Sequence, residues 1–221
     1  MKLLFQALTK YLCGVILVGL LLFLPAGTFD YPGAWLFMGL LFLPMLILGA
    51  VLLTKAPDLL AKRLSHREKE NTQKGVVALS ALAFLASFIL CGLDHRFGWT
   101  SVPLWLTVTA AVLLLLSYAM YAEVMRENAY LSRTVEVQEN QKVVSTGLYG
   151  IVRHPMYAAT VVLFLAIPLV LGSWIGFAVM LVYPIVIAVR ILNEEAVLTA
   201  GLDGYAEYKT KVKWRLIPFV W

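Results

Sequence analysis

The chain has 221 residues, of which 61% are hydrophobic and 14% are charged, and its formal net charge is +5. Soluble domains are about 45–50% apolar and about 25% charged, so this composition excludes an ordinary soluble globular protein. The basic residues are spread between long apolar runs rather than gathered in one patch. That distribution favours membrane topology over nucleic-acid binding as the explanation of the positive charge.

Apolar runs of membrane-spanning length occupy the first half of the chain. A transmembrane helix needs roughly 20 apolar residues to cross about 30 Å of hydrocarbon. Four runs meet that requirement, at residues 11–29, 34–53, 75–93 and 102–121. Each is therefore predicted to form one transmembrane helix.

A fifth apolar region, residues 156–191, is too long for one straight span. Pro168 and the pair Gly172-Ser173 interrupt it, which predicts two helices joined by a tight turn. The first of them would be only about 24 Å long at 1.5 Å per residue, so a second full crossing and a short hairpin both fit. The whole chain is thus predicted to be one all-α, polytopic membrane domain (1–221) with five to six transmembrane helices.

Lysine and arginine predict the orientation of these helices. They precede the first run, fill the segments between the second and third runs and between the fourth and fifth, and follow the last run. The opposite segments contain only Arg96. The positive-inside rule then places both termini and both long polar loops in the cytoplasm.

One of these loops, residues 55–74, contains leucines among basic residues. Leu59, Leu60 and Leu64 alternate with residues such as Lys62 and Arg67. This pattern fits a short helix lying on an anionic leaflet, and it also fits a solvated basic loop.

Polar and ionisable residues are concentrated in the last part of the chain. They are rare within the first four runs and dense from residue 138 onward. Because an ionisable group near the bilayer is costly, such a concentration indicates a functional site. We therefore divide the domain into a transmembrane scaffold, residues 1–123, and a part that holds the functional site, residues 124–221.

Three motifs follow one another in this second part. They are Ser145-Thr146-Gly147-Leu148-Tyr149 with Arg153-His154-Pro155-Met156-Tyr157, then Arg190-Ile191-Leu192-Asn193-Glu194-Glu195, then Tyr205-Ala206-Glu207-Tyr208-Lys209. In this order and spacing they resemble the isoprenylcysteine carboxyl methyltransferase family and the related phospholipid methyltransferases. The resemblance covers residues from about 135 to 221, while the first half is similar only as apolar spans.

The resemblance implies an S-adenosylmethionine-dependent O-methyltransferase. Its substrate would be a lipophilic, isoprenylcysteine-like carboxylic acid that reaches the site from the bilayer. The residues that the resemblance assigns to the cofactor are Gln138, Gln141, Lys142, Val143, Val144, Tyr149, His154, Pro155, Met156, Tyr157 and Glu194. It places Arg190 beside the substrate and makes Arg190 and Glu194 the candidate catalytic residues.

The residue types suit such a cofactor. A carboxylate such as Glu194 can pair with the sulfonium cation, and the helix start after Pro155 favours the cofactor carboxylate. Tyr149 and Tyr157 offer aromatic faces to adenine or to the sulfonium. A substrate carboxylate is already ionised at neutral pH and needs no general base, whereas an amine would need a proton acceptor, for which Glu195 is the candidate.

Other readings of the same residues stay open. The alternatives are a phospholipid amine N-methyltransferase, an intramembrane NADPH-dependent reductase and a non-catalytic membrane protein. No metal site is predicted, because His66, His95 and His154 lie far apart without cysteines at ligand spacing. Tyr205 and Tyr208 are expected to anchor the chain at the membrane interface rather than bind a ligand.

Overall fold

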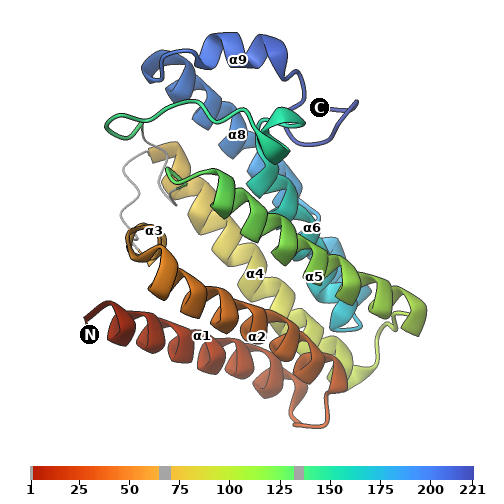
Figure 1. Cartoon of the computed structure of the whole chain (residues 1–221). Coiled ribbons are helices and arrows are strands. Elements are labelled where there is room, and N and C mark those ends of the chain that lie inside the picture. The colour runs from red at the N-terminus through yellow and green to blue at the C-terminus, as the bar shows by residue number, and fades with distance from the viewer. Residues whose placement is uncertain (1, 65–70, 132–136) are drawn as a thin grey trace.

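The computed structural model of the protein describes residues 2–64, 71–131 and 137–221. Every regular element in these ranges is a helix, which confirms the all-α prediction (Figure 1). In chain order the helices are α1 (Lys2–Ala26), α2 (Pro32–Lys55), α3 (Pro57–Leu64), α4 (Asn71–Phe97), α5 (Leu104–Glu127), the 3-10 turn η1 (Gly147–Gly150), α6 (Pro155–Val170), α7 (Trp174–Met180), α8 (Val182–Gly201) and α9 (Tyr205–Lys211).

Helix length separates the spans from the shorter helices. Among the described residues, five helical stretches are long and apolar enough to cross a bilayer: α1, α2, α4, α5 and the joined pair α7–α8. The prediction of five to six spans is confirmed. Helix α6 is apolar but has only 16 residues, or about 24 Å, so it falls short of a full crossing.

The tight turn predicted between α6 and α7 is present. Gly172 has φ +84°, a left-handed conformation that a side chain would strain. Ser173 then caps α7, because its hydroxyl accepts a hydrogen bond from the Gly176 backbone N–H at 3.0 Å. The turn therefore reverses the chain and begins the next helix within two residues.

One apolar cluster joins the helices of the bundle. Each of α1, α2, α4, α5 and α6 contributes at least one buried side chain, among them Leu22, Phe37, Cys91, Leu114 and Ile167. The outward faces of α1 and α2 remain largely apolar and exposed, as expected of a surface that meets lipid.

Glycine allows α4 to approach its neighbours closely. A Cβ atom on Gly92 would lie 2.7 Å from the carbonyl oxygen of Leu22 in α1. A Cβ atom on Gly176 in α7 would overlap the sulfur of Cys91 in α4. Small residues at such contacts are how membrane helices pack without a hydrophobic driving force between them.

Helix α3 packs on the protein. Leu59 is buried in a cluster with Val124 and Met125 of α5 and with Tyr149, and Leu60 is buried as well. The Lys10 ammonium also donates a hydrogen bond to the Leu64 carbonyl at 2.5 Å. The predicted short helix is thus present, but its two buried leucines face protein rather than an anionic leaflet; Arg67 lies outside the described residues.

A buried carboxylate closes the end of the bundle that lies away from α9 (Figure 1). Asp94, near the end of α4, is 1% exposed. Its Oδ1 accepts from the Thr100 backbone N–H at 2.7 Å, and its Oδ2 accepts from the hydroxyls of Thr100 and Ser173, both at 2.5 Å. Asp94 therefore ties α4 to the following loop and to the start of α7.

Candidate functional site

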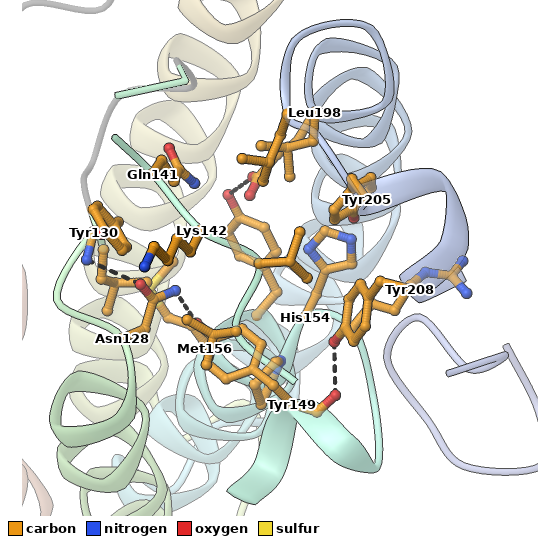
Figure 2. A pocket seen from close by; sticks show the side chains of 18 of the residues that line it. Asn128, Tyr130, Gln141, Lys142, Tyr149, His154, Met156, Leu198, Tyr205 and Tyr208 are labelled. Carbon is orange, nitrogen blue, oxygen red and sulfur yellow. Dashed lines mark hydrogen bonds between the residues drawn. The ribbon is translucent and has the colours of Figure 1, made fainter. Parts of the chain in front are cut away.

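A pocket lies at the opposite end of the bundle, where α6 begins and α8 ends (Figure 2). Its walls come from the segment that follows α5, the segment before η1, η1 itself, the start of α6, α8 and α9. The lining residues are Asn128, Tyr130, Leu131, Gln141, Lys142, Val143, Val144, Tyr149, Arg153, His154, Pro155, Met156, Tyr157, Arg190, Glu194, Leu198, Leu202, Tyr205 and Tyr208. All of them fall within the part of the chain predicted to bind cofactor and substrate.

The start of α6 forms one wall of the pocket. Pro155 suits the first helical position because its ring presets φ and it has no N–H to leave unpaired. His154 is the N-cap residue, and its side chain makes no capping hydrogen bond. The backbone N–H groups of Arg153 and His154 donate to the carbonyls of Trp214 and Arg215, both at 2.9 Å. The C-terminal segment is thereby fixed beside α6.

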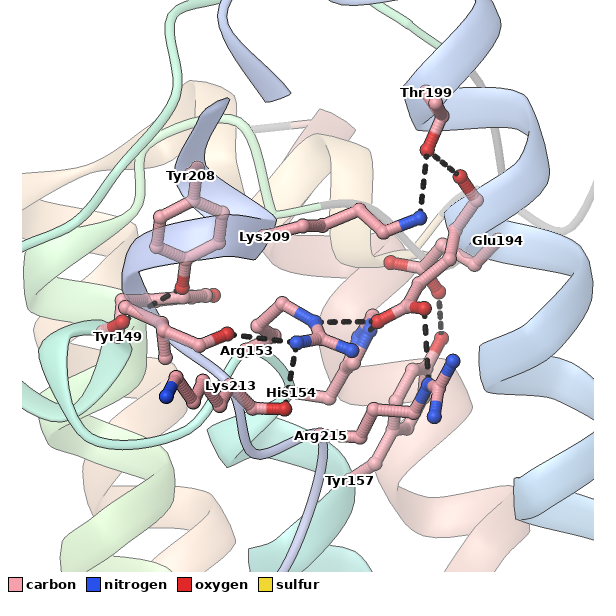
Figure 3. A network of polar contacts seen from close by, with 12 residues as sticks. Tyr149, Arg153, His154, Tyr157, Glu194, Thr199, Tyr208, Lys209, Lys213 and Arg215 are labelled. Carbon is pink, nitrogen blue, oxygen red and sulfur yellow. Dashed lines mark hydrogen bonds and ion pairs between the residues drawn. The ribbon is translucent and has the colours of Figure 1, made fainter. Parts of the chain in front are cut away.

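Glu195 is the centre of an ionic cluster behind this wall, and Figure 3 shows its partners Arg153, His154 and Arg215. The side chain is 3% exposed. Its Oε1 accepts from Arg153 Nε at 2.6 Å and lies 3.3 Å from His154 Nε2, while its Oε2 accepts from Arg215 Nε at 3.0 Å. Arg153 also donates from Nη1 to the carbonyls of Val212 and Lys213 at 2.7 and 2.9 Å. Glu195 thus joins α8, the start of α6 and the C-terminal segment.

Tyr157 connects the two predicted catalytic residues. Its hydroxyl donates to Glu194 Oε2 at 2.5 Å and accepts from Arg190 Nε at 2.8 Å. The Arg190 guanidinium also lies over the Tyr157 ring, with 5.7 Å between its central carbon and the ring centroid. Arg190 is 9% exposed, so its orientation is fixed by packing as well as by this bond.

The tyrosines of α9 face inward. Tyr205 and Tyr208 are buried and line the pocket, so the expectation that they anchor the membrane interface is wrong. The Tyr208 hydroxyl donates to the Tyr149 carbonyl at 2.6 Å, and the Tyr149 hydroxyl accepts from the Asn128 side-chain amide at 2.9 Å. The amphipathic character of Tyr suits a membrane surface and a pocket wall alike, so composition could not distinguish them.

The structure brings together all the predicted site residues except Gln138. The side-chain amide of Gln138 donates to the Tyr130 carbonyl at 2.5 Å, and its backbone N–H donates to the Gln141 side chain at 2.8 Å. Gln138 therefore shapes the loop that carries Gln141 and Lys142 without lining the pocket itself. What each of the lining residues binds stays a prediction.

Several lining residues were not predicted. Asn128, Tyr130 and Leu131 follow α5 in a segment without a motif, and Leu198 and Leu202 lie beyond the Arg-x-x-x-Glu-Glu motif. Arg153 is part of the Arg-His-Pro-x-Tyr motif, so the motif could have been used to predict that Arg153 lines the pocket.

Comparison with known proteins agrees with this geometry. The family model described as phospholipid methyltransferase matches residues 105–202, which include most of the pocket. A solved structure, that of the eukaryotic intramembrane Ras methyltransferase ICMT (isoprenylcysteine carboxyl methyltransferase), is similar with a TM-score of 0.55 and 20% sequence identity. The match covers 92% of this chain and 74% of that one. No curated protein matches in sequence.

These two matches carry different information. At 20% identity the likeness to ICMT establishes the fold, while the family model identifies the sequence pattern of residues 105–202. The resemblance expected from the motifs is confirmed at both levels. The chain therefore has the fold of an intramembrane methyltransferase, and its residues 105–202 match the family model described as phospholipid methyltransferase.

Proposed function

We propose that the protein transfers a methyl group from S-adenosylmethionine to the carboxylate of a lipophilic, isoprenylcysteine-like substrate. The substrate would reach the pocket from the bilayer, because the pocket lies at the end of membrane-spanning helices. The observation that carries the choice of a carboxylate is that Arg190 lines the pocket, whereas Glu195, the candidate proton acceptor, does not.

The chemistry of the pocket residues fits the cofactor. When bound, S-adenosylmethionine supplies an electrophilic methyl group on a sulfonium cation. Glu194 provides a carboxylate to pair with the cationic parts, and its orientation is fixed by the Tyr157 hydroxyl. No side chain caps the first turn of α6, so its positive end can receive the cofactor carboxylate. The Tyr149 ring adds an aromatic face.

Arg190 would hold the substrate carboxylate. The guanidinium lines the pocket, and the Tyr157 hydroxyl fixes its Nε. A planar guanidinium can bind a carboxylate through two parallel hydrogen bonds, a geometry that lysine cannot reproduce. Since Arg190 and Glu194 contact the same hydroxyl, the anion and cation sites would lie next to each other.

The position of Glu195 favours a carboxylate substrate over an amine. Methyl transfer to an ionised carboxylate gives a neutral ester and releases no proton, so no proton acceptor is needed. Transfer to an amine needs one, and Glu195 was the candidate. Glu195 does not line the pocket, and both of its oxygens are engaged by cationic side chains, among them Arg153 and Arg215. It therefore cannot reach a substrate amine.

A phospholipid amine N-methyltransferase is the second candidate. The description of the matched family model supports it. In this case Arg190 would repel a protonated amine, so its removal would be mild or beneficial.

The proposal includes the orientation of the protein in the membrane. The distribution of lysine and arginine puts both termini and the pocket on the cytoplasmic side. A reporter active in only one compartment, fused in turn to each end, tests this, and a signal from the far side at either end contradicts it.

Substitution of Arg190 tests the proposed function. Methyl transfer is measured on a farnesylated cysteine acid and on phosphatidylethanolamine, for the wild-type protein and for Arg190→Lys. We expect kcat/KM on the acid to fall by about 10- to 100-fold, because a charge-assisted two-point contact is lost. The Kd for the cofactor should stay close to the wild-type value.

A matched control is Arg126→Lys. Arg126 is exposed, pairs with Glu123 at 2.7 Å and lies outside the pocket, so transfer should be unchanged. Transfer to phosphatidylethanolamine alone, insensitive to Arg190→Lys, would establish the second candidate instead. Binding of NADPH in place of S-adenosylmethionine would point to a reductase, and binding of neither to a non-catalytic protein.

A further inference from the structure

Five tyrosines line the pocket, and four of their hydroxyls have partners within the protein. Tyr130 donates to the Asn140 carbonyl at 3.0 Å, and Tyr149 accepts from the Asn128 amide at 2.9 Å. Tyr157 bonds to Glu194 and Arg190, and Tyr208 donates to the Tyr149 carbonyl. These four hydroxyls hold the walls of the pocket together.

The fifth hydroxyl, that of Tyr205, differs from the others. Tyr205 is 4% exposed, and its Oη is the one buried side-chain nitrogen or oxygen without a hydrogen-bond partner in the described part of the chain. A buried hydroxyl left unpaired destabilises the folded protein, and native structures rarely retain one without a reason. The position of Tyr205 on a pocket wall supplies such a reason.

The Tyr205 ring is held firmly in this position. It begins α9 directly after Gly204, whose φ of +81° turns the chain, and its backbone N–H donates to the Leu202 carbonyl at 3.1 Å. The ring packs in an apolar cluster with Leu202, Leu198 and Val143, and its centroid lies 5.7 Å from that of Tyr208. The hydroxyl thus cannot swing away to find another partner.

The surroundings of this hydroxyl are apolar with negative charge nearby. Burial, together with the carboxylates of Glu195 and Glu194, raises the pKa of Tyr205 well above its ordinary value. The phenol therefore keeps its proton at neutral pH and can donate a hydrogen bond. Figure 2 shows Tyr205 on the same side of the pocket as Leu198 and His154, across from Gln141 and Lys142.

We infer that the Tyr205 hydroxyl hydrogen-bonds the nucleoside end of the cofactor. The inference rests on the proposed function. A flat apolar wall with a single neutral polar group suits a purine and its ribose, which are uncharged. The charged amino-acid end would instead meet Glu194 and the start of α6, and the substrate carboxylate would meet Arg190. Tyr205 is thus a cofactor-binding residue that the resemblance did not assign to the cofactor.

The test compares Tyr205→Phe with the wild-type protein in detergent by calorimetry. The ligands are S-adenosylhomocysteine and 5′-methylthioadenosine, which keeps the nucleoside but lacks the amino-acid end. Loss of one hydrogen bond should raise both Kd values by roughly 3- to 10-fold, and by the same factor for the two ligands. Tyr205→Phe without ligand should be as thermally stable as the wild type or more so, because it removes an unpaired buried hydroxyl.

Tyr208→Phe is the matched control. It removes a hydroxyl whose partner is a protein carbonyl, so it should lower the melting temperature of the unliganded protein. A wild-type Kd for S-adenosylhomocysteine in Tyr205→Phe would overturn the inference, and a loss confined to S-adenosylhomocysteine would overturn its assignment to the nucleoside end. Failure of the wild-type protein to bind S-adenosylhomocysteine would overturn the proposed function and this inference with it.

Discussion

Two buried carboxylates lie at opposite ends of the bundle, and their partners differ in kind. Asp94 accepts from uncharged donors, the backbone and hydroxyl of Thr100 and the hydroxyl of Ser173. Glu195 contacts the side chains of Arg153, His154 and Arg215. Both carboxylates are almost completely buried, so burial alone does not separate them.

The comparison shows that partners, rather than burial, distinguish the two regions. At Asp94, neutral donors from Thr100 and Ser173 are enough to hold the end of α4, the following loop and the start of α7 together. An ionic cluster joins three chain segments and leaves Arg153 and His154 on the wall of a pocket. A buried acidic residue within a membrane protein is therefore evidence of function only together with the charges that surround it.

Removal of the charge at Glu195 should have the largest effect. Glu195→Gln preserves the shape of the side chain but leaves the Arg153 and Arg215 cations without a counter-charge. We expect the free energy of unfolding to fall by about 3–5 kcal/mol, as for the loss of one partner from a buried ion pair. Cofactor affinity should fall as well, because His154 and the C-terminal segment are no longer fixed. Denaturant unfolding in detergent and calorimetry measure the two effects.

Removal of the charge at Asp94 should have a smaller effect. Asp94→Asn replaces one carboxylate oxygen by an NH2 group, which cannot accept a hydrogen bond, so at least one of the bonds from Thr100 and Ser173 is lost, at a cost of about 1–3 kcal/mol of stability. The Kd for S-adenosylhomocysteine should not change, because the pocket lies at the other end of the bundle. A change in that Kd without a change in stability would contradict the prediction. It would mean that Asp94, like Glu195, affects the pocket.

The smallest effect is expected at Glu207 in α9. Its carboxylate pairs with Lys211 at 2.7 Å, and both side chains are exposed. Because surface ion pairs contribute little, Glu207→Gln should leave the melting temperature and the cofactor Kd at their wild-type values. Glu207→Gln is the control for Glu195→Gln, because it removes a carboxylate from α9 that is not part of the ionic cluster. A clear loss of stability or of cofactor affinity in Glu207→Gln would mean that the effect of Glu195→Gln is not specific to the cluster.

The sequence predicted the membrane helices well, because bilayer thickness imposes their length. The run predicted at residues 156–171 is α6 at Pro155–Val170, and the turn at Gly172-Ser173 is where it was expected. Helix α1 begins nine residues before the predicted apolar run, because residues such as Leu4 and Phe5 are apolar as well and extend the candidate span back to Leu3. Most residues of the pocket were predicted from the motifs, whereas those after α5 and near the end of α8, such as Asn128 and Leu198, were not.

The relations between those residues could not be predicted. Glu195 contacts Arg153 across 42 positions of sequence, and nothing local identifies that pairing. The bridging hydroxyl of Tyr157 and the inward orientation of Tyr205 likewise depend on how α6, α8 and α9 pack together. Periodicity and motif spacing describe one segment at a time, so they do not predict contacts between distant segments.

The contacts of Arg153 have a consequence for biosynthesis. Its carbonyl acceptors at Val212 and Lys213 lie 59 and 60 residues further along the chain. During translation α6 therefore leaves the ribosome well before the residues that complete the ionic cluster. The ionic cluster is therefore complete only after residues 212–215 have been synthesised and have packed against the start of α6.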